Sequence, residues 1–216
     1  MTSPGFLDGA VATYLAANTT PPTPLEQRLI DQTRLMAAGG MQISHPQAQF
    51  MTMLTRILRP KVVIEIGTFT GYSALVVAKA LDDDATLIAC DLSDEWTSVG
   101  RPYWDEAGVA DKIDLRLGPA SETLAALDPG TSVDMAFIDA DKTGYIGYFE
   151  QLVPLLSGRG VILVDNVLWN GQIVDPDDQR ADTVALRDFS THVLADARVE
   201  VALLPIGDGL SMITMA

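Results

Sequence analysis

Two apolar stretches of this sequence run directly into side chains that can bind a metal ion. "FIDADK" contains Asp139 and ends in Lys142, and "LVDN" ends in Asp165 and Asn166. Carboxylate and amide oxygens are the hard ligands that Mg²⁺ prefers, with Ca²⁺ or Mn²⁺ as alternatives, and neither motif contains the Cys or His that zinc prefers. If both stretches are neighbouring strands, their ends lie about 4.8 Å apart at one edge of a sheet. The pattern predicts a divalent-cation site formed by Asp139, Asp165 and Asn166.

Each aspartate also has a plainer interpretation, because a lone Asp at a strand end commonly caps a helix or faces solvent. The pair favours the metal, since two carboxylates at one edge repel each other and need a cation between them. Lys142 is the only basic residue in either motif. We expect it either to act as a catalytic base or to pair electrostatically with Asp139 or Asp141.

A turn with two glycines precedes these motifs and indicates a cofactor site. In "EIGTFTGYS", Gly67 and Gly71 enclose a tight turn between an apolar run and a helical segment, whose first N–H groups point at the turn. A dinucleotide fingerprint requires glycine where this chain has Phe69, which argues against a bound phosphate. Asp91 ends the next apolar run, where a carboxylate can accept both hydroxyls of a ribose. Together these signals indicate a nucleoside cofactor without phosphates.

The elements that would position these residues follow an alternating pattern. From residue 61, apolar runs of five to seven residues alternate with helical segments, which is typical of βαβ units and a mainly parallel sheet with helices on both faces. The predicted strands are 61–66, 86–91, 112–117, 133–139, 160–165, 198–205 and 210–216. "IGDG" between the last two is too short for a crossover, so the last strand should run antiparallel. We expect a doubly wound α/β fold with seven strands.

The N-terminal part of the chain predicts helices alone. Residues 6–17 and 25–38 have helical character and are separated by the proline-rich "TTPPTP". A third helix should begin near Ser44 or Pro46 and continue to Leu58. The length fits one domain of residues 1–216, with N-terminal helices in 1–58 and an α/β core in 61–216.

Composition and charge argue against several classes of function. The net charge of −15 repels polyanions and argues against nucleic acid as a partner. No apolar run reaches the length of a membrane span, and the N-terminus lacks the basic region of a signal peptide, so we expect a cytoplasmic protein. The single cysteine, Cys90, lies in the apolar run "TLIAC", where a buried and inert thiol is expected.

The motifs taken together resemble the cation-dependent, S-adenosylmethionine-dependent O-methyltransferases, the family of the catechol and caffeoyl-coenzyme A O-methyltransferases. The similarity covers nearly the whole chain and is closest to small bacterial members. It runs through "GGMQIS", "IEIGTFTGYS", "CDLSDEW", "RLGPA", "FIDADKTGYIGYFE", "VDNVLWNG" and "LLPIGDGL". The resemblance implies the family's Rossmann-like sheet with a reversed seventh strand, S-adenosylmethionine as cofactor, a catechol-like acceptor and usually a homodimer.

The resemblance also implies roles for individual residues. The family's metal ligands fall on Asp139, Asp165 and Asn166, its proton acceptor falls on Lys142, and Trp169 matches an aromatic residue beside the acceptor ring. Other positions match contacts to the cofactor, although Met41 and Tyr148 are equally consistent with ordinary packing. The implied cofactor contacts are Met41, Ser44, Glu65, Gly67, Ser73, Asp91, Ala120, Asp139, Asp141 and Tyr148.

Other activities fit the sequence less well. The acidic loop at 175–183 offers little to bind the phosphates of an acyl-coenzyme A, which ranks a hydroxycinnamoyl ester below a free catechol. Methylation of a hydroxylated RNA base conflicts with the net charge. Phe69 argues against a nicotinamide-dependent oxidoreductase. The intact set of Asp139, Lys142, Asp165 and Asn166 argues against a binding module without chemistry.

Overall fold

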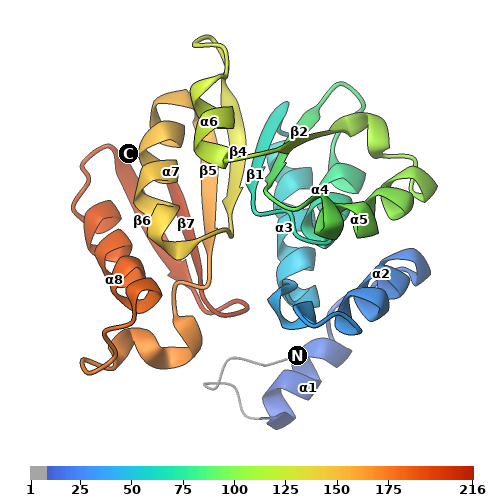
Figure 1. Cartoon of the computed structure of the whole chain (residues 1–216), viewed down its shortest axis with the longest axis horizontal. Coiled ribbons are helices and arrows are strands. Elements are labelled where there is room, and N and C mark those ends of the chain that lie inside the picture. Colours follow the sequence, from blue (N-terminus) through green and yellow to red (C-terminus); the bar gives the residue numbers. More distant parts are fainter. Residues whose placement is uncertain (1–8) are drawn as a thin grey trace.

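The computed structural model describes residues 9–216, which form a seven-stranded sheet between two layers of helices (Figure 1). The strand order is β3-β2-β1-β4-β5-β7-β6. The strands are β1 Val62–Ile66, β2 Thr86–Asp91, β3 Ile113–Leu117, β4 Val133–Ile138, β5 Leu156–Asp165, β6 Val199–Leu204 and β7 Leu210–Met215. β7 runs antiparallel to both β5 and β6, whereas the other pairs are parallel. The predicted doubly wound sheet with a reversed last strand is confirmed.

The order of the strands reverses between β1 and β4. The chain builds outward from β1 through β2 to β3, then returns to place β4 on the other side of β1. Open α/β sheets bind ligands outside the carboxyl ends of the strands at such a point. β4 and β5 are direct neighbours, with Ile138 opposite Val164. Asp139 and Asp165 therefore follow adjacent positions of adjacent strands, which was the condition for a shared site.

Most strands differ from the sequence prediction by one residue at one or both ends, and the start of β5 differs by four. β4 ends at Ile138, one residue early, but the Asp139 N–H still donates to the Ile66 carbonyl at 2.8 Å. β5 begins at Leu156, four residues before the predicted start. Its glycine-containing start "SGRG" looks like a loop in sequence, yet Leu156 pairs with Val133 before a shift of register. Glycine in a strand commonly marks such an irregularity.

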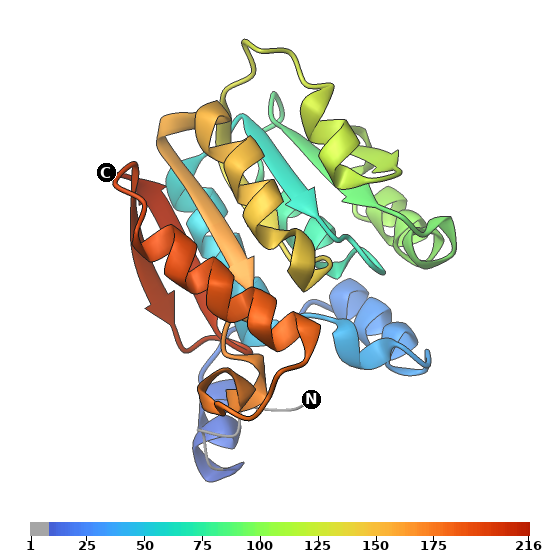
Figure 2. The same ribbon diagram turned by 60° about the vertical axis from the view of Figure 1, so that its left-hand side comes forward.

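Helices cover both faces of the sheet (Figure 2). They are α1 Gly9–Ala17, α2 Pro24–Arg34, α3 His45–Leu58, α4 Tyr72–Ala80, α5 Asp94–Glu106, α6 Ala120–Ala125, α7 Tyr145–Leu152 and α8 Ala181–Leu194. Short 3₁₀ helices connect them at η1 Gly39–Met41, η2 Ala110–Lys112, η3 Lys142–Gly144, η4 Val153–Leu155 and η5 Trp169–Val174. One apolar core lies between the sheet and α2 to α5, and the other lies between the sheet and α6 to α8. None of the helices in residues 9–216 is long and apolar enough to cross a membrane.

The N-terminal helices follow the sequence prediction in part. Residues 6–8 of the predicted first helix lie outside the described residues, and α1 covers the remainder. α2 has a capping box in which Thr23 and Glu26 bond each other's backbone. It ends at Arg34, four residues early, because the chain turns there into η1. α3 begins after Ser44, whose side chain accepts the Gln47 N–H as predicted for a cap.

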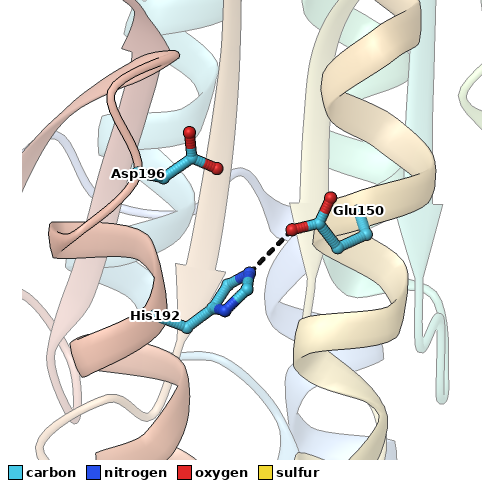
Figure 3. Close-up of side chains that lie close together, drawn as sticks. All are labelled: Glu150, His192 and Asp196. Carbon is cyan, nitrogen blue, oxygen red and sulfur yellow. Dashed lines mark hydrogen bonds and ion pairs between the residues drawn. The ribbon is translucent and has the colours of Figure 1, made fainter.

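A cluster of charged side chains joins α7 to α8 on the surface. Glu150, His192 and Asp196 point toward one another, in an arrangement that could hold a metal ion (Figure 3). Arg198 already supplies a cation there, since its guanidinium donates to both Glu150 oxygens at 3.0 and 2.9 Å and to Asp196 at 2.5 Å. His192 Nε2 lies 2.7 Å from Glu150 Oε1. We interpret this cluster as an ion-pair network that fixes α8 and β6 to α7.

Candidate active site

A cavity of about 440 Å³ opens where β4 and β5 end. It brings together Ile30 and Arg34 of α2, residues 39–47, the segments that follow β4 and β5, and the turn before β7. The predicted metal and acceptor residues all line it, and Lys142 and Asp165 are only 9% and 2% exposed. They are Asp139, Lys142, Asp165, Asn166 and Trp169.

Lys142 lies at the centre of this group. Its Nζ donates to Asp139 Oδ1 at 3.0 Å, to Asn166 Oδ1 at 2.7 Å and to the Tyr145 hydroxyl at 2.7 Å. An ammonium has three N–H donors, so each has an acceptor. The Tyr145 hydroxyl in turn donates to the Asp165 carbonyl at 3.1 Å. In this arrangement Lys142 is an electrostatic partner of Asp139, one of its two predicted roles.

The two carboxylates are held in a poorly solvated position. Burial raises the pKa of Asp139, although the nearby Lys142 ammonium acts in the opposite direction. Burial and the charge of Asp139 together raise the pKa of Asp165 to about 8, while a contact with the Gln47 amide acts to lower it. When both acids are ionised, the single ammonium of Lys142 balances only one of their two negative charges.

Asn166 completes the oxygen ligands. Its backbone is left-handed at φ 60°, a region that Asn visits more readily than most residues. Its N–H donates to Asp165 Oδ1 at 2.8 Å, and its Oδ1 accepts from Lys142. Two carboxylates and an amide oxygen at one edge, short of positive charge, form a ligand set that fits a hard divalent cation.

A second, smaller hollow adjoins the cavity at the turn between β1 and α4. Met41, Gly67, Ser73 and Asp139 line it, so part of the predicted cofactor group meets the metal group here. Gly67 is required at this point, because a Cβ at its φ of +93° would lie 2.4 Å from the Asp139 carbonyl oxygen. The absence of a side chain lets the turn pack directly against the end of β4.

Asp91 is held in place by the same turn. Its Oδ2 accepts the Phe69 N–H at 2.7 Å and its Oδ1 accepts the Ser93 N–H at 2.8 Å. Phe69 itself is left-handed at φ 52°. Phe69, which replaces the glycine of a dinucleotide fingerprint, therefore donates its N–H to Asp91. In this chain the turn orients a carboxylate, whereas in a dinucleotide site it would approach a phosphate.

Glu65 is a buried acid in the middle of the sheet. It lies in β1, is 1% exposed, and accepts a hydrogen bond from the Ser73 hydroxyl at 2.5 Å. Burial raises its pKa to about 8, despite this hydrogen bond. A carboxyl group in such a position favours its neutral form unless a cation comes close to it.

The other predicted cofactor residues lie further out. The Tyr148 hydroxyl donates to Asp141 Oδ1 at 2.6 Å, and Ala120 is buried at the start of α6. Burial, and then this hydrogen bond, raises the pKa of Tyr148. These three residues line neither of the two hollows, whereas Ser44 lines the larger one.

The segment after Asn166 has an unusual backbone. Trp169, Asn170 and Gly171 are left-handed in succession, at φ 49°, 52° and 80°. Lys142 Nζ lies 5.9 Å from the centroid of the Trp169 ring. The Asn170 N–H donates to Asp208 Oδ1 at 2.6 Å, which fixes this segment to the turn before β7. Non-glycine residues of this conformation persist only where surrounding contacts hold them.

Arg187 holds the remainder of this loop from α8. Its guanidinium donates to the carbonyl oxygens of Ile173 at 2.9 Å and Asp178 at 2.8 Å. It also donates to those of Gln172 at 3.2 Å and of Asp175. One side chain thus satisfies four backbone acceptors of a loop that would otherwise rest on few contacts.

Sequence patterns did not indicate several of these residues. Tyr145 resembles a core residue of its helix, and nothing near Gln47 or Arg187 in the chain shows what each contacts. Asp208 lies in "IGDG", which was interpreted only as a turn. The repeated glycines of that motif were the one signal that could have directed attention to Asp208, since tight turns beside a cavity often carry binding residues.

Comparisons with known proteins identify the family of this chain. A family model described as O-methyltransferase matches residues 18–215. The probable caffeoyl-CoA O-methyltransferase 2 of Dictyostelium discoideum is 38% identical over 212 residues, which cover 96% of this chain and 92% of that protein. The catechol O-methyltransferase domain-containing protein 1 of Mus musculus is 37% identical over 209 residues, covering 95% of this chain and 79% of that protein.

A solved structure shows the same fold. The methyltransferase of Podospora anserina, crystallised with S-adenosylhomocysteine, superposes with a TM-score of 0.87 at 31% identity, covering 96% of this chain and 94% of that one. The resemblance recognised in the sequence is confirmed. The family match across nearly the whole chain, together with these relatives, shows that this protein belongs to the O-methyltransferase family.

Proposed function

We propose that this protein transfers a methyl group from S-adenosylmethionine to one hydroxyl of a catechol-like aromatic molecule, with a divalent cation holding the acceptor. The observation that carries the proposal is the group of Asp139, Asp165 and Asn166 around Lys142, of which Asp165 and Lys142 are buried, beside the turn at Gly67. The relative crystallised with S-adenosylhomocysteine supports the cofactor, since that molecule is what remains of S-adenosylmethionine after methyl transfer.

Asp139, Asp165 and Asn166 would hold the cation, with Mg²⁺ the best candidate for their oxygen atoms. When bound, such a cation would chelate two adjacent hydroxyls and stabilise a phenolate. The hydroxyl of a free phenol has a pKa near 10, so little phenolate forms at neutral pH without such help. Lys142 would accept the hydroxyl proton at Nζ. For this it has to be a neutral amine. Its three donors now point at Asp139, Asn166 and Tyr145, so the ammonium would first release one proton to water and give up one of these contacts.

The cofactor would lie across the β1–α4 turn. Asp91 would accept the ribose hydroxyls, and Glu65 and Ser73 would lie along the methionine moiety with Gly67. The remaining contacts would come from residues nearer its two ends. These are Met41, Ser44, Ala120, Asp141 and Tyr148. The buried Glu65 carboxyl supports this placement, because the ammonium group of methionine would supply the cation that its position lacks.

The acceptor would lie against Trp169, within the cavity that also contains Lys142. We favour a free catechol over a hydroxycinnamoyl ester because the loop after η5 is rich in acids, and one of them, Asp178, already pairs with Arg180. The chain would act in the cytoplasm as one methyltransferase domain, and it would assemble as a homodimer as the resemblance implies.

The test is a methyl-transfer assay with catechol and with phenol. EDTA should abolish transfer to catechol, Mg²⁺ should restore it, and phenol should be a poor acceptor because it cannot chelate. Asp165→Asn should be folded and nearly inactive. Asp196→Asn, which removes an acid from the surface network, is the matched control and should retain activity. Full activity in EDTA with no cation present would refute the proposed role of this group.

A further inference from the structure

One buried amide in the cavity has no role in the arrangement described so far. Gln47 is only 1% exposed, and it lines the cavity together with Asp165 and Asn166. Its Nε2 makes no well-formed hydrogen bond to any residue in the described part of the chain. An unpaired buried donor is destabilising, so native proteins retain few of them, and each requires a reason.

The position of this side chain is fixed from two directions. At its backbone, Gln47 is in the first turn of α3, where Ser44 Oγ accepts its N–H at 3.4 Å. At its tip, Oε1 packs against Gly207, where a Cβ would lie only 2.3 Å away. Gly207 has φ +60°, so glycine suits this turn both by conformation and by space. The amide group is therefore held with its carbonyl toward the turn.

The amide group also lies beside a metal-ligand candidate. Gln47 and Asp165 line the same cavity, and the buried amide is near enough to the Asp165 carboxyl to lower its pKa. The other known contact of this carboxyl is the Asn166 N–H, which binds Oδ1 at 2.8 Å. A donor on each side of a carboxylate fixes its rotation, and groups that orient metal ligands in this way commonly change metal affinity 10- to 100-fold.

We propose that Gln47 is a positioning residue of the cation site: when a cation is bound, its unpaired amide nitrogen donates to Asp165 and aims that carboxylate at the cation. This inference rests on the proposed function, because it requires that Asp165 binds a metal. It also means that the start of α3 contributes two side chains, those of Ser44 and Gln47, to the larger hollow.

The experiment is a calorimetric titration of Mg²⁺, repeated with Mn²⁺, into the cofactor-free protein. Gln47→Leu keeps the approximate volume of the side chain but removes the donor, and it should weaken metal binding at least tenfold. Gln49→Leu is the matched control, since Gln49 lies on the same helix but lines neither hollow, and it should bind metal like the wild type. S-adenosylmethionine affinity, measured without metal, should be equal in all three proteins.

The outcomes separate this inference from the proposed function. If the wild type binds neither metal, the proposed function fails. If the wild type binds metal and Gln47→Leu binds it equally well, the positioning role is wrong. A parallel loss of cofactor and metal affinity in Gln47→Leu would also overturn it, because that result indicates a merely structural role.

A second variant decides the matter if Gln47→Leu does not fold. Gly207→Ala leaves Gln47 in the chain but places a methyl group against its Oε1, so the amide has to move. We expect weaker binding of both metals with unchanged cofactor affinity, and unchanged metal binding would overturn the inference.

Discussion

Glu65→Gln should make the cofactor-free protein more stable, by an amount that depends strongly on pH. The unfolded chain releases the Glu65 proton near its ordinary pKa of 4.5, whereas burial in β1 raises the pKa in the folded chain to about 8. Between these values the folded state binds more protons than the unfolded state. Stability must therefore fall as pH rises through this window.

The magnitude follows from these two pKa values. Each pH unit well inside the window costs about 1.4 kcal/mol, so Glu65 alone should remove about 3.5 kcal/mol of unfolding free energy between pH 5 and pH 8. Glutamine has nearly the same shape, can still accept the Ser73 hydrogen bond, and has no proton to lose. The variant should lack this part of the pH dependence.

The assay is urea-induced unfolding of both proteins at several pH values between 5 and 8. Other buried acids, including Asp165, are present in both proteins, so the difference between the two curves isolates Glu65. Glu26→Gln is the control of opposite sign, because burial raises the Glu26 pKa but bonds from Lys79 and Thr23 more than offset this and lower it. A difference between wild type and Glu65→Gln that does not change with pH would refute this reasoning.

Three further predictions concern the proposed reaction. Asp91→Asn should weaken S-adenosylmethionine binding by about 1.5 to 3 kcal/mol, because a charged acceptor is lost. Calorimetry measures this affinity, and an unchanged value would exclude Asp91 from the ribose site. Lys142→Met should lower kcat far more than it lowers cofactor affinity, and kcat should recover in part at high pH, where the phenol ionises unaided. If the initial rates at neutral pH equal those of the wild type, Lys142 has only an electrostatic role. In Arg187→Lys the guanidinium fork of donors is lost, and the lysine cannot bond four carbonyls. The variant should raise the acceptor KM severalfold while cofactor affinity stays constant. An unchanged KM in steady-state kinetics would show that the loop does not need this contact.

The sequence predicted the fold well because the sheet depends on local patterns. Apolar runs separated by helical segments identified all seven strands, and the four-residue "IGDG" turn identified the reversed one. Boundaries were less certain where tertiary contacts overrode local preference. β5 starts early because Leu156 pairs with Val133 despite the glycines that follow it, and α2 ends early where the chain turns into η1.

The candidate site was predictable to the extent that geometry links strand ends. Asp139 follows β4 and Asp165 ends β5, and the carboxyl ends of neighbouring parallel strands meet at one edge of a sheet. Gln47 and Tyr145 were not predictable in this way. Their roles depend on where a helix packs and which way one side chain points, and periodicity contains neither kind of information.

The hydrogen bonds from Arg187 to the end of η5 and to the loop that follows it have a consequence for how this protein can change over evolutionary time. The contacted atoms are main-chain oxygens, which every amino acid carries, so the anchor places no demand on the identity of residues 172–178. Mutations can alter the charge and size of these side chains while the path of the loop is preserved. A protein library that varies the loop but retains Arg187 should therefore contain many folded members with altered acceptor preference.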